Sequence, residues 1–179
     1  MRLFFAYWPS SEKAQEMAIW VDRAQALCGG RPMRTDTLHM TLAFLGMADA
    51  EKARDLAHAC RQWRLPTGSM VLNEPGRFRN AKVVWLGPSQ PDSPALSWLY
   101  DANEQLWDAL SSFGWPRQDS RYRPHISLLR NAGPAELDDL RGPAIPWTPE
   151  RCVLVASEPT EGRSRYTVLA EVPLEAPRS

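Results

Sequence analysis

The stretch LHMTLAFL, residues 38–45, has a counterpart later in the chain, PHISLLRN at residues 124–131. Each stretch contains a histidine, one apolar residue, a hydroxyl residue and a leucine, in that order. The two histidines, His39 and His125, are separated by close to half of the 179 residues. Alternation of polar and apolar residues predicts a half-buried β-strand for each stretch. The repeat therefore predicts two lobes of similar build, each holding one of these strands.

Hydrophobic periodicity divides the rest of the chain into further strands and helices. Runs rich in aromatic and β-branched residues predict strands at residues 2–8, 70–78, 82–86, 151–157 and 165–172. Apolar residues that recur every three or four positions predict three longer helices, which begin near Ser10, Asp49 and Ser93, and a short helix near residues 135–141.

These elements predict an α+β fold made of a pseudo-twofold pair of antiparallel β-sheets, with helices on the outer faces and a central groove. We expect one bilobal domain over residues 1–179. Its lobes cover roughly residues 1–90 and 91–179, with room for strands to be exchanged between them. The most linker-like segment, GPSQPDSP at residues 87–94, lies near the midpoint. Grooves between lobes are common ligand sites.

The composition narrows the functional class and the compartment. The chain has 44% hydrophobic residues, and its 21 basic and 21 acidic side chains give a net charge of zero. This balance argues against nonspecific binding of long nucleic acids, which requires a strongly basic protein. Three widely spaced cysteines, Cys28, Cys60 and Cys152, fit neither a disulfide framework nor a zinc site. With no candidate membrane span or signal peptide, we expect a cytoplasmic monomer.

The two histidine strands carry the groups that phosphodiester chemistry needs. Because side chains alternate along a strand, His39 and Thr41 share one face, as do His125 and Ser127. One imidazole can accept a proton from the attacking oxygen while the other protonates the leaving oxygen. The hydroxyl groups can stabilise charge on the phosphate. The pattern therefore favours an enzyme that cleaves a phosphoester.

A single His-x-Thr/Ser pattern is more often an ordinary strand histidine bonded to a neighbour. The duplication, the strand context and the spacing favour the catalytic interpretation here. The chain has three histidines, and the third, His58, lies off the apolar stripe of its predicted helix, so we expect it at the surface.

Arginines near the second motif are candidate phosphate ligands. Arg130 is the nearest cation, but strict alternation places it on the face opposite Ser127, so the strand would have to end or twist there. Arg121 and Arg123 precede the motif and either steer RNA phosphates or lie on a solvated turn.

The chain resembles the 2H phosphoesterase superfamily, which is named for its two His-x-Thr/Ser motifs. Within it, the chain is similar to the bacterial and archaeal RNA 2′,3′-cyclic phosphodiesterases, which are 2′-5′ RNA ligase-like proteins. The resemblance is carried by RLFFAYWP at 2–9, LHMTLAFLG at 38–46, RPHISLLR at 123–130 and the strand after Gly162 that contains YTVL. One departure is Ser127, where threonine is commoner, and it keeps the hydroxyl.

The resemblance implies hydrolysis of a terminal 2′,3′-cyclic phosphate on RNA to a 2′-phosphate, with neither a metal nor another cofactor. Some members also join RNA ends through 2′-5′ linkages. By position, His39 would protonate the departing O3′ and His125 would activate water. Thr41, Ser127 and Arg130 would hold the phosphate oxygens.

The resemblance also implies that Phe44 stacks on the terminal base, as proteins often do with RNA ends. Strict alternation instead puts Phe44 on the side of Leu42, in the core. Two other functions stay open: a cyclic phosphodiesterase that acts on small nucleotides, which the neutral charge allows, and a nonenzymatic nucleotide-binding module. The intact histidines and hydroxyls of both motifs argue against the second.

Overall fold

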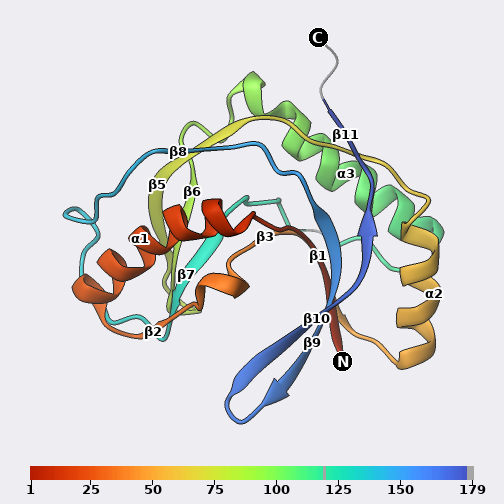
Figure 1. The fold of residues 1–179 in the computed structure, drawn as a ribbon, viewed down its shortest axis with the longest axis horizontal. Helices are drawn as coiled ribbons and strands as arrows, with labels where there is room; N and C mark the ends of the chain where they lie inside the picture. Colours follow the sequence, from red (N-terminus) through yellow and green to blue (C-terminus); the bar gives the residue numbers. More distant parts are fainter. Residues whose placement is uncertain (119, 177–179) are drawn as a thin grey trace.

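A computed structural model describes residues 1–118 and 120–176, in which a curled sheet is packed against three helices (Figure 1). The strands are β1 (Arg2–Tyr7), β2 (Arg31–Pro32), β3 (Met40–Met47), β4 (Leu65–Pro66), β5 (Met70–Phe78), β6 (Val83–Pro88), β7 (Ile126–Arg130), β8 (Ile145–Trp147), β9 (Cys152–Thr160), β10 (Arg163–Val172) and β11 (Leu174–Glu175). The helices are α1 (Ser11–Cys28), α2 (Ala50–Cys60) and α3 (Ser97–Ser112). Single 3₁₀ turns lie at Thr35–Thr37 and Pro94–Leu96.

Nine strands form one antiparallel sheet in the order β10-β9-β1-β3-β7-β6-β5-β8, with β2 paired to β7. At its centre β3 and β7 are joined through one residue pair, Met40 opposite Ile126. The β3 side of this joint holds β1, β3, β9 and β10, which come from the two ends of the chain. The β7 side holds β5, β6, β7 and β8 from the middle of the chain, together with β2 from before β3. Each half of the sheet therefore contains strands from both halves of the sequence, residues 1–90 and 91–179.

The predicted α+β class is confirmed. The two expected sheets are present as the two halves of a single continuous sheet, which curls into a half-barrel (Figure 1). One half has four strands, and the other has four together with the short β2. The sequence does not reveal this continuity, because the joining pair links residues far apart in the chain.

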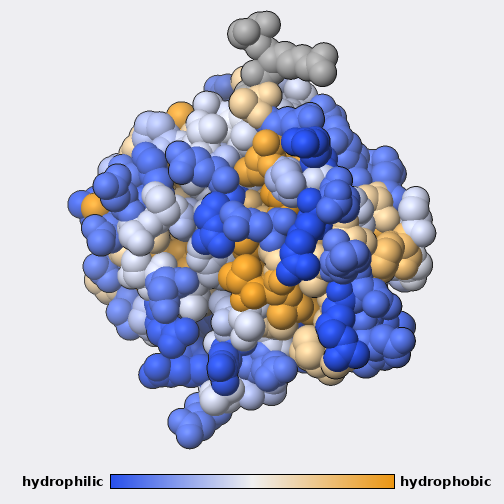
Figure 2. Space-filling model, turned by 45° about the vertical axis from the view of Figure 1, so that its right-hand side comes forward, coloured by the Kyte–Doolittle hydropathy of each residue, from blue (hydrophilic) through white to orange (hydrophobic). Residues whose placement is uncertain are grey.

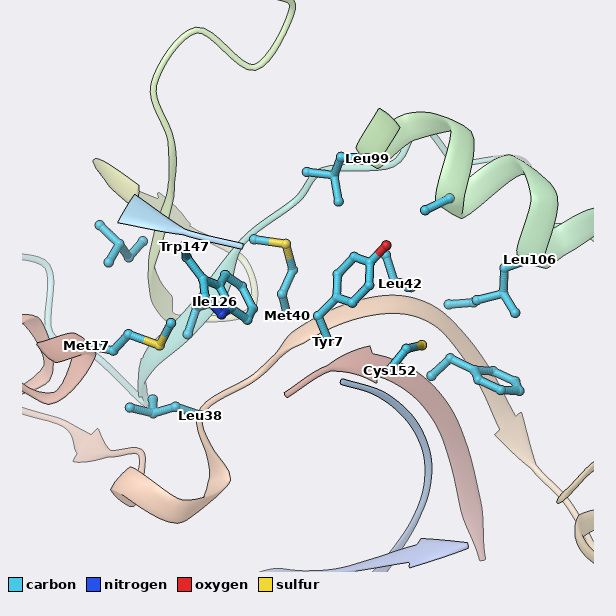
Figure 3. Close-up of a cluster of buried hydrophobic side chains, with 14 of the residues drawn as sticks. Tyr7, Met17, Leu38, Met40, Leu42, Leu99, Leu106, Ile126, Trp147 and Cys152 are labelled. Carbon is cyan, nitrogen blue, oxygen red and sulfur yellow. The ribbon is translucent and has the colours of Figure 1, made fainter. Parts of the chain in front are cut away.

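The main core lies on the face of the sheet that the helices cover. Met40 and Ile126 point into it together with Tyr7 and Leu42, and side chains of α1 and α3 pack around them (Figure 3). All four strand residues are at most 1% exposed. Burial of each such apolar side chain contributes about 1.5–3 kcal/mol to folding. Because neighbours alternate, this burial turns the flanking residues of β3 and β7 to the opposite, helix-free face.

The helices begin at the expected capping residues. The Ser10 and Asp49 side chains accept hydrogen bonds from the backbone amides of Lys13 and Lys52, at 3.2 and 2.8 Å. Ser93 caps the 3₁₀ turn that leads into α3, so the α-helix itself starts a few residues later than the sequence suggests.

The short helix predicted near residues 135–141 is not formed; the segment consists of turns and irregular backbone. Pro134 and Gly142–Pro143 enclose a stretch too short to nucleate a helix by itself. Instead, Arg77 donates hydrogen bonds of 2.6 and 2.7 Å to the carbonyls of Gly133 and Ala135, which fixes the start of the segment.

The face shown in Figure 2 is mostly hydrophilic, with a small hydrophobic patch near its centre. None of the helices in the described ranges combines the length and the apolar character needed to cross a membrane.

Candidate active site

The joint between β3 and β7 brings the two motifs together. Met40 and Ile126 face each other across the antiparallel pair and point into the core. Counting one residue outward in this register brings His39 toward Ser127, and Thr41 toward His125. His39 and His125 each lie immediately before their strand, and the charge of His125 acts on the pKa of His39, so the two imidazoles are near each other. Both imidazoles and both hydroxyls therefore lie on one small area of the helix-free face.

The two imidazoles are anchored in the same way. Nδ1 of His39 lies 2.7 Å from the carbonyl oxygen of Thr37, and Nδ1 of His125 lies 2.7 Å from that of Arg123. A carbonyl can only accept, so each Nδ1 carries the proton and donates it. This fixes the tautomer and leaves each Nε2 available to accept a proton from, or return one to, a ligand between the rings.

A β-bulge follows each motif at the same position. On β3, Ala6 of β1 pairs with Thr41 and Phe5 pairs with Ala43, so Leu42 is an extra residue. On β7, Trp85 of β6 pairs with Ser127 and Val84 pairs with Leu129, so Leu128 is an extra residue. Each extra residue and the one after it are both buried. The alternation of faces is therefore reversed beyond each bulge.

The bulges return two candidate ligands to the face of the histidines. Phe44 pairs with Phe4 on that face and is 45% exposed. Arg130 follows buried Leu129 and lines a pocket with Thr37 and Tyr166. Phe44 and Arg130 occupy equivalent places, each five residues after its histidine. Strict alternation places both on the opposite face; one inserted residue in each strand accounts for the difference.

His39 is enclosed by aromatic rings. Its imidazole stacks on Phe4 and on Trp8, each at a centroid distance of 4.9 Å, and Tyr166 of β10 meets it edge-on at 5.6 Å. Burial lowers the pKa of His39 to about 4. The nearby positive charges of Arg130 and His125 act in the same direction, and the hydrogen bond to Thr37 opposes them.

His125 has a different enclosure, from β5 and β6. Phe78 meets the imidazole edge-on at 4.9 Å, and the Trp85 ring is tilted against it at 6.2 Å. Burial lowers the pKa of His125, and the hydrogen bond to the Arg123 carbonyl opposes the shift. Near neutral pH both imidazoles of the free protein are therefore uncharged, with a lone pair on Nε2.

A groove of about 930 Å³ opens beside the motifs and is lined by Thr41, Phe44 and His125, together with one side of α3 and residues 117–118 and 120–123. Its wall is tied to the free edge of β3 by side chains. Tyr122 donates to the Thr41 carbonyl at 3.0 Å, and Gln118 to the Phe44 carbonyl at 2.7 Å. These bonds hold the groove against the strand that carries the first motif.

The described residues do not bring three or more His, Cys, Asp or Glu side chains together as a metal-ligand set. His58 is exposed on α2, as expected. Arg121 forms an ion pair with Asp92 at 2.6 Å on the surface of the groove, and Arg123 supplies the carbonyl that orients His125.

The aromatic enclosure is the part of the site that sequence reasoning missed. The strand patterns predict Trp8, Phe78, Trp85 and Tyr166 only as ordinary strand residues. A signal was available, because aromatic residues at alternate positions of the strands next to each histidine lie on the same face as the imidazole.

The chain is similar in sequence to a known protein family and to several characterised proteins. A family model described as the 2′-5′ RNA ligase superfamily matches residues 9–158. A protein from Escherichia coli (strain K12) named RNA 2′,3′-cyclic phosphodiesterase is 33% identical over 170 residues, which cover 94% of this chain and 93% of that protein. A protein of the same name from Thermotoga maritima is 30% identical over 150 residues, covering 78% and 77%.

Solved structures agree with these matches. The crystal structure of E. coli LigT complexed with 3′-AMP has a TM-score of 0.80 and 32% identity, and covers 97% of both chains. The crystal structure of TT0787 of Thermus thermophilus has a TM-score of 0.74 and 26% identity, and covers 96% of this chain and 97% of that one.

Proposed function

The chain belongs to the 2′-5′ RNA ligase superfamily and is a cyclic phosphodiesterase, and we propose that it hydrolyses the 2′,3′-cyclic phosphate at RNA 3′ ends to a 2′-phosphate. The observation that carries this proposal is the single pairing of Met40 with Ile126. Two identically anchored imidazoles flank this pair, and neither Nε2 atom has a hydrogen-bond partner within residues 1–118 and 120–176.

In the proposed reaction, water attacks phosphorus while the bond between phosphorus and O3′ breaks. His125 Nε2 accepts the proton of the attacking water, and protonated His39 gives its Nε2 proton to the departing O3′. The products are a 2′-phosphate and a 3′-hydroxyl. This assignment follows the family resemblance. Burial lowers the pKa of His39 to about 4 in the free protein, so the protonated form depends on the bound phosphate anion, which raises this pKa.

Three side chains are assigned to the phosphate. The hydroxyls of Thr41 and Ser127 donate to the nonbridging oxygens, and the guanidinium of Arg130 balances the charge that builds up on them. Arg130 is near enough for its charge to act on the pKa of His39. Phe44, half exposed at the groove, offers a surface on which the terminal base can stack.

Ligation of RNA ends requires the same two proton transfers as hydrolysis. If a 5′-hydroxyl of RNA replaces water, its oxygen bonds to phosphorus, O3′ leaves as a hydroxyl and a 2′-5′ linkage forms. The same two imidazoles transfer the protons, so ligation is proposed as a second, reversible activity of this site.

The test is an assay on an oligonucleotide that ends in a 2′,3′-cyclic phosphate, carried out in EDTA. We expect complete conversion to the 2′-phosphate, identified by its resistance to an enzyme that removes only 3′-phosphates. Lack of conversion, or a 3′-phosphate product, contradicts the proposal. Addition of an RNA with a 5′-hydroxyl tests ligation in the same reaction.

A further inference from the structure

The histidine pair has a second set of walls, on the side away from the groove of α3. There the tip of the β9–β10 hairpin, which projects from the body of the protein in Figure 1, meets β2 and the turn before β3. We call this the hairpin pocket. It comprises two adjoining depressions whose charged lining residues are Arg31, Arg34, Asp36, Arg130, Glu161, Arg163 and Arg165.

The hairpin pocket is directly connected to the catalytic face. Thr37 lines it, and the carbonyl of Thr37 anchors His39. Tyr166 also lines it and contacts the His39 ring edge-on. A strand whose terminal phosphate lies between the histidines can therefore place a neighbouring phosphate in this pocket.

The arginines of the two sides differ in their partners. In the groove of α3, Arg117 is paired with Glu104 and Asp108, at 2.7 and 2.5 Å, and Arg121 with Asp92. Arg123 lines this groove without an ion pair to the described residues, and the three arginines are matched in number by the lining carboxylates Asp92, Asp101 and Glu104. In the hairpin pocket, Arg31, Arg130, Arg163 and Arg165 have no carboxylate within 4.0 Å in the described parts of the chain. Arg34 contacts exposed Asp36 at 3.5 Å.

The pocket is also held in shape. Arg31 donates a 2.7 Å hydrogen bond to the carbonyl of Gly162 at the hairpin tip, and Arg31 pairs with Arg130 between β2 and β7. The hairpin is thus fixed across the end of the sheet joint. Five arginines against two carboxylates, in a shaped concavity, favour an anionic ligand with more than one charge along its length.

We propose that the hairpin pocket binds the internucleotide phosphate next to the terminal nucleotide, so that the preferred substrate is an RNA strand rather than a free cyclic nucleotide. This inference rests on the proposed function. The uncharged base then occupies the groove beside Phe44, where the three lining arginines are balanced by three carboxylates. The backbone follows the hairpin pocket, where arginines outnumber carboxylates. The zero net charge of the chain is consistent with such local contact.

The test compares kcat/KM for 2′,3′-cyclic AMP with kcat/KM for a dinucleotide and a longer oligonucleotide that end in the same cyclic phosphate. Arg34→Ala and Arg163→Ala each should lower the oligonucleotide value by about tenfold. The value for cyclic AMP should stay within about twofold of wild type. Arg163→Glu should lower kcat/KM for the oligonucleotides further than Arg163→Ala does. The dependence of log kcat/KM on log salt should become shallower by about 0.7 for each phosphate that a variant no longer neutralises.

Arg151→Ala is the matched control, because it removes an exposed arginine at the far end of the same strand pair, where Arg151 contacts Glu171. It should leave the ratio of the two substrates unchanged. If wild type hydrolyses both substrates and the pocket variants lower both equally, or neither, the inference is wrong while the proposed function holds. If wild type hydrolyses neither substrate, both fail.

Discussion

The strands that follow His39 and His125 have the same backbone features, but different side chains surround the two imidazoles. Each histidine donates from Nδ1 to the carbonyl two residues earlier, and each motif is followed by a bulge at the same leucine. The rings around them differ: His39 is stacked between neighbouring aromatic faces, whereas His125 meets Phe78 by its edge. The comparison teaches that one backbone device fixes the geometry of both imidazoles, and local packing then sets their individual proton affinities.

The comparison is tested most strongly by removing each imidazole in turn. His39→Ala and His125→Ala should each lower kcat for a cyclic-phosphate RNA by about 10²–10⁴-fold, because each supplies a separate proton transfer in the proposed mechanism. Initial rates of single-turnover hydrolysis measure the loss. His58→Ala, on the exposed surface of α2, should retain wild-type activity. Near wild-type activity in either active-site variant would exclude a two-histidine mechanism.

A smaller effect should follow from displacing an aromatic side chain that packs against one of the two histidines. A Cβ at Gly76 would overlap the indole of Trp85, which packs against His125. Gly76→Ala should therefore displace Trp85 and lower kcat by about tenfold, since misplacement of a catalytic group is costly. It should leave KM and the environment of His39 nearly unchanged. NMR titration of the two imidazoles checks this, because the pKa of His125 should change and that of His39 should not.

Gly68→Ala is the control for Gly76→Ala. Its Cβ would lie 2.6 Å from Trp98, a tryptophan outside the catalytic face, so it introduces a similar clash elsewhere. Both variants should lose thermal stability. Only Gly76→Ala should lose kcat, and an equal loss in both would assign the effect to general destabilisation.

The smallest expected effect is on pH dependence. A mechanism that needs one protonated and one neutral imidazole has its maximum midway between the two pKa values. Because burial lowers the pKa of both histidines, to about 4 for His39, kcat/KM should be maximal below pH 6.5. The kcat profile should lie at higher pH, since a bound phosphate anion raises both pKa values.

Trp8→Ala sharpens this prediction for one histidine. Opening the stacked side of His39 to water should raise its pKa and move the maximum of kcat/KM to higher pH by less than one unit. Phe78→Ala should act instead on His125. A maximum at or above pH 6.5 in the wild-type protein would contradict the assigned burial effects.

Much of the fold could be predicted from the sequence because its signals are local. Ser10 and Asp49 mark helix starts, and the alternation around His39 and His125 marks two strands with a polar face. The continuity of the sheet could not be predicted, since the contact between Met40 and Ile126 depends on the packing of elements distant in sequence.

The faces of Phe44 and Arg130 show where simple alternation fails. A bulge adds one residue without a strong composition signal, and every later side chain then changes face. The only trace in the sequence is a pair of consecutive apolar residues after each hydroxyl, Leu42-Ala43 and Leu128-Leu129, where alternation calls for one. Two such pairs at equivalent positions are more informative than either alone.

The joint at Met40 and Ile126 has a consequence for how this enzyme can be tuned. Among the described residues, a single strand-pairing partnership joins the β3 and β7 halves of the sheet, and its side chains lie in the hydrophobic interior. The distance between the two imidazoles therefore depends on the buried side chains of Met40 and Ile126, on the core face of the sheet. A change in side-chain volume there would widen or narrow the catalytic gap without altering any atom that a nucleotide touches.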